Sequence, residues 1–140
     1  MRISAVLLLL WGSFSHADDE SYTYVSMIDL IANPAFFVDQ TITLRGYLDF
    51  EIAKNMHLFP TKDHALMDDF ASSLLVGNYI VGDSDIGRIC GGNYASIEGK
   101  FLRSDMWVSP GRWMHHYRFE EINSVEVLSD SGVFEGCYER

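Results

Sequence analysis

The sequence predicts a mainly β protein, a small five-stranded barrel, and two stretches with alternating polarity are the basis of this prediction. In residues 41–50, TITLRGYLDF, apolar side chains occupy every second position, which is the period of a half-buried strand. Residues 94–102, YASIEGKFL, repeat this pattern. In each stretch a glycine, Gly46 or Gly99, stands in the inward row, where it predicts a kink, a bulge or a close backbone approach. Two curved strands of this kind are typical of a small closed sheet.

Length and composition indicate one globular domain with enough apolar residues for a packed core. The chain has 140 residues, of which 48% are hydrophobic and 14% are aromatic. Its formal net charge is -10, and the ten lysines and arginines are scattered, with no two adjacent. Because a chain this acidic without a basic stripe repels phosphate backbones, we expect no nucleic-acid partner. The same charge is compatible with a basic protein partner, although solubility alone also explains it.

The first 17 residues have the pattern of a secretory signal peptide. Arg2 supplies a positive start, residues 3–11 form an apolar run too short to span a bilayer, and Ser15 and Ala17 are the small residues of a cleavage site. We therefore expect cleavage after Ala17 and a periplasmic or secreted protein whose residues 18–140 form a single barrel domain. The alternative is that residues 1–17 are an ordinary buried first element. No later stretch is apolar enough to predict a membrane span.

A helix is predicted between this segment and the first strand of the barrel. Ser26 and Asp29 have the spacing of a capping box, and apolar residues follow at helical intervals. Pro34 disfavours helix at the residue before it, so the helix is expected to end there. Residues 35–38, AFFV, then lead into a turn before the first strand.

The later elements are short, and most are delimited by proline or glycine. Residues 56–59 predict a second strand, which Pro60 closes. A helical turn is expected within residues 61–70, with Leu66, Met67 and Phe70 on one apolar face. The remaining segments are, in order, a third strand at 73–76, a short helix at 86–90, the glycine-bearing strand at 94–102, a loop at 104–112, a long strand or pair of strands at 113–128 with a bulge near Glu120 and Glu121, and a tail at 129–140.

The two cysteines of the chain, Cys90 and Cys137, predict a disulfide, because the protein is expected in an oxidising compartment. Such a bridge would anchor the C-terminal tail to the segment before the fourth strand. In the chain-entropy model it contributes on the order of 3–4 kcal/mol. Two unpaired thiols are the alternative, and a redox role is disfavoured since the cysteines lack the C-x-x-C spacing.

The predicted order of elements, three strands, a helix and two strands, is that of the OB fold, a five-stranded Greek-key barrel. Here the order is preceded by the N-terminal helix. The segments LIANPAFFVDQTITLRGYL and GGNYASIEGKF also resemble recurring parts of small bacterial exported OB-fold proteins of unassigned function. The resemblance covers about half of the chain that follows the signal peptide. Its motifs are structural, so it implies the fold and an exported location but no active site.

We expect no catalytic residues, no metal site and no cofactor. A zinc site needs three or four converging ligands, and the spacing of His57, His64, His115 and His116 matches no such frame. No G-x-S-x-G motif, ordered triad or phosphate-binding loop is present in the sequence.

Aromatic residues are the best candidates for a binding surface. OB barrels bind ligands on the face of strands two and three and on the adjacent loops. Near this face the sequence places five candidates: Tyr47, His57, Phe59, Trp107 and Trp113. Aromatic side chains are favoured anchors of protein interfaces. The alternative is that these side chains cap the barrel ends and pack the core.

The function predicted from these observations is an exported, non-catalytic module that recognises a protein partner in the cell envelope. An inhibitor or immunity-type protein is a narrower version of this prediction, because an acidic blocker associates faster with a cationic enzyme. A nucleic-acid-binding or small-ligand-binding OB domain is the first alternative, and a small envelope hydrolase is the second. The sequence predicts no oligomeric state.

Overall fold

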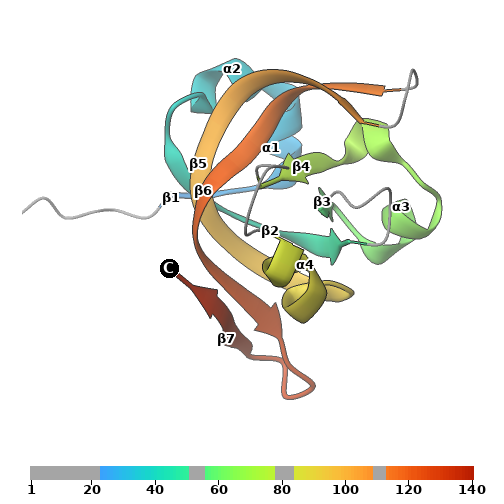
Figure 1. Ribbon diagram of the computed structural model, residues 1–140, viewed down its shortest axis with the longest axis vertical. Helices are drawn as coiled ribbons and strands as arrows, with labels where there is room; N and C mark the ends of the chain where they lie inside the picture. Colours follow the sequence, from blue (N-terminus) through green and yellow to red (C-terminus); the bar gives the residue numbers. More distant parts are fainter. Residues whose placement is uncertain (1–22, 51–55, 78–83, 109–112) are drawn as a thin grey trace, which may run out of the picture.

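The computed structural model describes residues 23–50, 56–77, 84–108 and 113–140 (Figure 1). The predicted signal peptide, residues 1–17, lies outside the described part of the chain. The elements are, in order, β1 (Thr23–Val25), α1 (Met27–Ala32), α2 (Pro34–Phe37), β2 (Thr41–Asp49), β3 (Met56–Phe59), α3 (Lys62–Leu66), the 3-10 turn η1 (Phe70–Ser72), β4 (Leu74–Val76), α4 (Ser84–Cys90), β5 (Asn93–Val108), β6 (Trp113–Leu128) and β7 (Phe134–Glu139). None of the helices within these residues is long and apolar enough to cross a bilayer.

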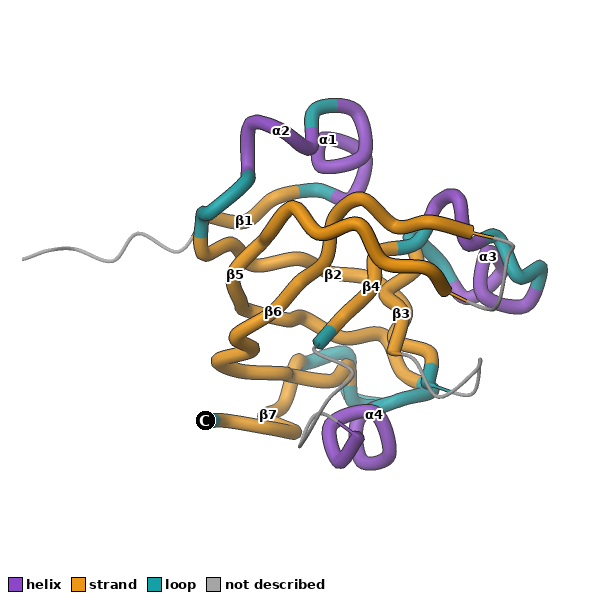
Figure 2. The backbone as a smooth tube through the Cα atoms, turned by 45° about the horizontal axis from the view of Figure 1, so that its top comes forward, coloured by secondary structure: helices purple, strands orange, loops and turns teal. Residues whose placement is uncertain are grey.

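Five of the strands close into a barrel, which confirms the predicted fold class. Around the barrel the order is β2, β3, β4, β6 and β5, and β5 pairs again with β2. All neighbours are antiparallel except β4 and β6, which are parallel through Leu75 with Arg118 and Val76 with Phe119. A helix, α4, connects β4 to β5 (Figure 2). This is the topology of an OB-like barrel.

Both predicted inward glycines lie where two strands approach closely. A Cβ atom added to Gly46 would collide with the backbone carbonyl oxygen of Phe59 on the neighbouring strand β3. A Cβ atom added to Gly99 would lie 2.9 Å from the carbonyl oxygen of Glu120 on β6. At that point the register between β5 and β6 shifts, and Glu121 has a φ of 48°. The bulge predicted near Glu120 is therefore present, and Gly99 faces it.

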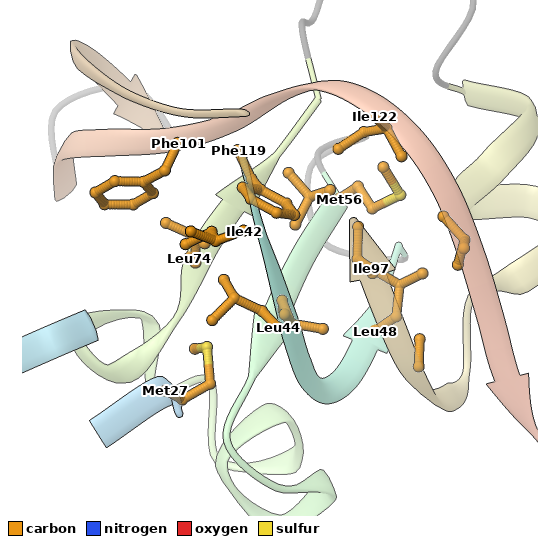
Figure 3. Close-up of a cluster of buried hydrophobic side chains, with 14 of the residues drawn as sticks. Met27, Ile42, Leu44, Leu48, Met56, Leu74, Ile97, Phe101, Phe119 and Ile122 are labelled. Carbon is orange, nitrogen blue, oxygen red and sulfur yellow. The ribbon is translucent and has the colours of Figure 1, made fainter. Parts of the chain in front are cut away.

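The hydrophobic core fills the barrel and continues under the helices at its two ends (Figure 3). Helix α1 covers one end with Leu30, which is buried, and α4 covers the other end with Ile86 and Cys90 (Figure 1). Helix α1 begins as predicted, since the backbone N–H of Asp29 donates to the Ser26 hydroxyl over 3.0 Å. The core side chains labelled in Figure 3 are Met27, Ile42, Leu44, Leu48, Met56, Leu74, Ile97, Phe101, Phe119 and Ile122.

Two predictions about the helical segments need correction. Pro34 follows the end of α1, as expected, but it also begins a second short helix, α2, within the segment that was expected only to lead into a turn. Proline is favoured at a first helical position, where its missing N–H has no intrahelical partner to lose. The expected apolar face of residues 61–70 is also wrong, because α3 ends at Leu66 and both Leu66 and Met67 are exposed.

Two predictions about the C-terminal half also need correction. Residues 104–108 of the predicted loop at 104–112 belong instead to strand β5, and Met106, Trp107 and Val108 pair with β6. Residues 109–112 lie outside the described part of the chain. The tail at 129–140 contains a strand, β7, which pairs with Ser124–Leu128 of β6.

A further short strand, β1, runs parallel to β2 and was not predicted.

The predicted disulfide is present, with a distance of 2.07 Å between the sulfur atoms of Cys90 and Cys137. Cys90 is the last residue of α4, and Cys137 lies in β7. The bridge therefore joins the helix at one end of the barrel to the C-terminal strand, which lies beside that helix (Figure 1).

Candidate functional site

Two of the residues predicted to form a binding surface are buried inside the protein. His57 and Phe59 both have an exposed fraction of 0%. They alternate along β3 with Leu58, which belongs to the barrel core, so they point to the outer face of the strand. Their inclusion in an exposed surface was wrong, because another part of the chain covers this face.

The segment between β3 and β4 forms this cover. Helix α3 lies beside β2 and β3 (Figure 2). Phe70, the first residue of η1, places its ring centroid 5.3 Å from that of His57 and 6.1 Å from that of Phe59. The Ser73 hydroxyl lies 3.2 Å from Nδ1 of His57. The face of the second and third barrel strands, where OB barrels commonly bind ligands, is thus occupied by the protein's own side chains.

Trp107 and Trp113 lie in the long hairpin made by β5 and β6. Trp107 pairs with Met114, and Trp113 pairs with Val108, so both residues are at the end of the hairpin where β5 ends and β6 begins. Their side chains lie outside the part of the structure that is described, and their predicted role in binding stays a prediction.

Tyr47, the remaining predicted candidate, belongs to a group of exposed or half-buried aromatic and basic residues on the outer side of the sheet. Alternation along β2 places Arg45 on the same face as Tyr47. Tyr94 of β5 pairs with Tyr47, and Tyr24 of β1 pairs with Thr43, so both lie in the same outward row. The group is completed by Lys62 at the start of α3. We call this surface the aromatic–basic face, and its residues are Tyr24, Arg45, Tyr47, Lys62 and Tyr94.

At one end of the aromatic–basic face, two tyrosines and a lysine contact one another. The rings of Tyr47 and Tyr94 meet edge to face with their centroids 5.5 Å apart. The backbone N–H of Lys62 donates to the Tyr94 hydroxyl over 3.2 Å, and its ammonium nitrogen lies 5.9 Å from the Tyr47 ring centroid. Tyr94 keeps 40% of its surface exposed. This end therefore offers rigid aromatic edges with a cation beside them.

At the other end, Arg45 lies between two aromatic rings. Its guanidinium carbon is 4.9 Å from the ring centroid of Tyr24 and 4.7 Å from that of Phe134 in β7. These cation–π contacts hold the guanidinium charge near both rings, and they supply none of the carboxylate oxygens that its N–H groups can donate to. Among the described residues, no carboxylate forms an ion pair with Arg45.

A groove of about 660 Å³ lies beside Arg45 and opens to solvent. Its walls come from the end of β1, the start of α1 and the residues that follow β3. Of the described residues that line it, Arg45 is the one that is charged; the others are Tyr24, Val25, Ser26, Met27, Ile28, Pro60 and Thr61. Tyr24 and Ile28 are exposed by 62% and 78%, so the groove has an apolar and accessible rim.

A second, smaller pocket of about 240 Å³ is lined by α1, the start of α2, the segment from η1 to β4, and residues of β5 and β6. Most of its lining is apolar, with Leu30 and Phe101 among the contributors. At its edge His116 forms a 2.7 Å contact through Nδ1 with the carboxylate of Asp105. Both of these side chains are more than half exposed, so the pair adds little to stability.

The histidines of the described residues do not converge on one place. His64 contacts Thr61, whereas His57 and His116 lie in the separate surroundings given above. Within the described part of the chain, no three histidine, cysteine, aspartate or glutamate side chains are grouped as metal ligands. The side chain of His115 lies outside that part.

The contact between His57 and Ser73 is the nearest resemblance to a hydrolase dyad, but its hydrogen bonds run in the wrong direction. The Ser73 hydroxyl donates to the carbonyl oxygen of Phe70 over 3.0 Å. A hydroxyl has one proton, so Nδ1 of His57 must donate to Ser73. A histidine that donates to a serine does not activate that serine as a nucleophile.

Comparisons with known proteins assign no function to this chain. No protein-family model and no curated protein sequence matches it. Among solved structures, it is similar to a Leishmania major protein assigned as an aspartyl-tRNA synthetase, with a TM-score of 0.44 and 15% identity. The match covers 91% of this chain and 23% of the other, so this chain spans about a quarter of that protein. A likeness at this level carries no argument about function.

Sequence reasoning missed Tyr24, Arg45, Lys62 and Tyr94 as members of the candidate site. Arg45 stands two residues before Tyr47, and Tyr94 starts the second alternating stretch, so the outward rows of both strands already contained them. Tyr24 and Lys62 depend on β1 and α3, whose positions beside the sheet have no local sequence pattern.

Proposed function

We propose that this protein is an exported, non-catalytic binding module that recognises a protein partner in the cell envelope through the aromatic–basic face. The observation that carries the proposal is the composition of this face. Tyrosine and arginine are enriched among the residues that dominate the binding energy of protein interfaces, and such residues lie in well-packed surroundings. Here three tyrosines, Arg45 and Lys62 lie together, and their rings and cations already contact one another.

The charge of the rest of the protein supports a partner that is basic overall. The formal net charge is -10, and acidic residues lie beyond the aromatic–basic face on the same sheet. Glu98 of β5 follows Tyr94 and Ser96 in the outward row, and Glu126 of β6 pairs with Ser96. An acidic surface of this kind raises the association rate with a cationic protein. An inhibitor or immunity-type role toward a basic envelope enzyme is the narrower form of this proposal.

The proposal is tested by affinity capture from an envelope extract of the source cells, with the protein produced from its full-length sequence as bait. A bait with Tyr47→Ala and Tyr94→Ala is compared with the wild type. The control bait carries Leu66→Ala and Met67→Ala, which remove apolar side chains that lie outside the face and are even more exposed than the two tyrosines. A captured protein is then purified, and its Kd is measured against all three baits.

We expect a partner whose Kd rises at least tenfold with the tyrosine double variant and less than threefold with the control. Association should also be slower at about 0.5 M salt than at about 0.05 M salt, since the Debye length shortens from about 14 Å to about 4 Å. Capture of no specific protein at either salt concentration, or equal loss of binding with both double variants, would contradict the proposal. A thermal melt of each bait confirms that it is folded.

A further inference from the structure

We infer that the groove beside Arg45 is a subsite for a carboxylate, and that its occupant is an aspartate or glutamate side chain of the protein partner. This inference rests on the proposed function and adds the chemistry of one contact to it. Among the described residues, Arg45 is the sole charged one in the lining of a groove of about 660 Å³. The described part of the lining therefore presents one cation among uncharged residues, on a strongly acidic protein.

The guanidinium group of Arg45 is held in place before any ligand arrives. Its carbon lies 4.9 Å from the Tyr24 ring centroid on β1 and 4.7 Å from the Phe134 ring centroid on β7. Two rings that contact the same group restrict its rotamers, so less side-chain entropy is lost when a ligand binds. The ring faces attract the positive charge of the group but offer no carboxylate to neutralise it, so a ligand can still supply one.

The geometry and charge of the guanidinium group favour a carboxylate over other acceptors. Guanidinium donors form a fork that matches the two oxygens of a carboxylate, and the paired hydrogen bonds are charge-assisted. Among the described residues, no acidic side chain forms an ion pair with Arg45, so its charge is not neutralised there by the protein itself. By contrast, the guanidinium of Arg118 on β6 is 2.6 Å from the carboxylate of Glu120.

The remaining walls of the groove indicate the surroundings of that carboxylate. Two of the hydroxyl groups at the groove are already engaged, because Ser26 contacts Asp29 and Thr61 contacts His64. Ile28 and Pro60 offer apolar contacts, and Ile28 is 78% exposed. The occupant that fits is therefore an acidic side chain with an apolar neighbour in the partner's chain. A partner that is basic overall matches the negative net charge of this protein. One acidic residue in that partner would match the positive charge of Arg45 at the groove.

The test uses a random linear peptide library displayed on phage and selected on the immobilised full chain. Enriched peptides are synthesised with their acidic residue and with the matching amide, Asp→Asn or Glu→Gln. Each is titrated against the wild type, Arg45→Gln and Arg103→Gln. Arg103 is an exposed residue of β5 that does not line the groove, so its variant controls for the loss of one positive charge.

We expect the selected peptides to carry an acidic residue next to an apolar one. Their Kd should rise at least tenfold on conversion to the amide and on Arg45→Gln, and less than threefold on Arg103→Gln. Library selection that enriches no peptide, peptides that lack an acidic residue, or peptides that bind Arg45→Gln as tightly as the wild type would overturn the inference.

A second pair of variants keeps the test informative if Arg45→Gln unfolds the protein, since Arg45 links β1, β2 and β7. Ile28→Glu and Ile28→Lys replace the same exposed side chain with opposite charges. The glutamate variant should bind the acidic peptides at least tenfold more weakly than the lysine variant, and equal binding would refute a carboxylate site. A partner that depends on Tyr47 and Tyr94 but tolerates Arg45→Gln would refute this inference and leave the proposed function standing.

Discussion

Replacing Gly46 with alanine is expected to lower the free energy of unfolding by about 2 kcal/mol. The new methyl group would collide with the backbone carbonyl oxygen of Phe59 and lie 2.9 Å from Cγ of Leu58. A rotamer change can move Leu58, but only a shift of the whole strand β3 can move the carbonyl. Over-packing of this kind costs about 1–3 kcal/mol, and the reduced entropy of the unfolded chain returns less than about 1 kcal/mol.

The same substitution at two further glycines should cost less stability, so the three variants can be ranked. At Gly99 the nearest atom to an added Cβ is the carbonyl oxygen of Glu120 at 2.9 Å, in a bulge that can adjust, so Gly99→Ala should cost about 1 kcal/mol. At Gly136 in β7 nothing lies within 4 Å of an added Cβ, and Gly136→Ala should leave stability unchanged or raise it by less than about 1 kcal/mol.

The assay is urea unfolding followed by circular dichroism, with the disulfide intact in every variant. Equal slopes of free energy against urea concentration would show that the variants differ in stability alone. For a domain of this size, a loss of about 2 kcal/mol corresponds to a melting temperature lower by roughly 8 °C. The reasoning fails if Gly46→Ala is as stable as Gly136→Ala, or if Gly136→Ala is the least stable of the three.

Three other predictions concern the disulfide, the first helix and the covered face of β3. Reduction of the bridge between Cys90 and Cys137, which are 47 residues apart, should lower the free energy of unfolding by about 4 kcal/mol, as measured by urea titration with and without reductant. Ser26→Ala removes the hydroxyl that caps α1 and should cost about 1 kcal/mol in the same titration, whereas Ser26→Asp should retain most of the stability. Phe59→Ala should cost about 3–5 kcal/mol without changing partner affinity in the fraction that remains folded; a loss of affinity with unchanged stability would show that Phe59 is a surface contact after all.

The barrel could be predicted because the alternation of apolar and polar residues in its longer strands shows which side of each strand is buried. The alternation of residues 41–50 identifies one buried and one outward row, and the inward position of Gly46 identifies the close approach to β3. By contrast, β1 has three residues, too few to show a period, and β7 has no regular alternation of buried and exposed residues. Both strands form because a longer strand already offers them an edge, which is a property of the tertiary structure.

The candidate site was predicted less well, because its position depends on which face of β3 the chain covers. All four residues of Met56–Phe59 are buried, so this strand is covered on both faces. A short apolar run is compatible with such a strand, and the sequence MHLF contained that information. The sequence did not show which segment of the chain packs over the outer face of β3. The contact of Phe70 with His57 and Phe59 joins residues that no local pattern relates.

The covered face of β3 bears directly on which kind of ligand the barrel can accept. A single strand of nucleic acid needs aromatic platforms along a positively charged groove. Here the side chains that would supply platforms on β3 are enclosed by η1. The half-buried tyrosine on β2 and the exposed tyrosine on β5 are accompanied by two cations in a chain of net charge -10. A protein interface has no such requirement, since a few ordered tyrosine and arginine side chains carry most of its binding energy. The cover on β3 and the exposed row on β2 and β5 therefore both favour a protein as the partner, recognised on the side of the barrel where the chain leaves its aromatic rings accessible.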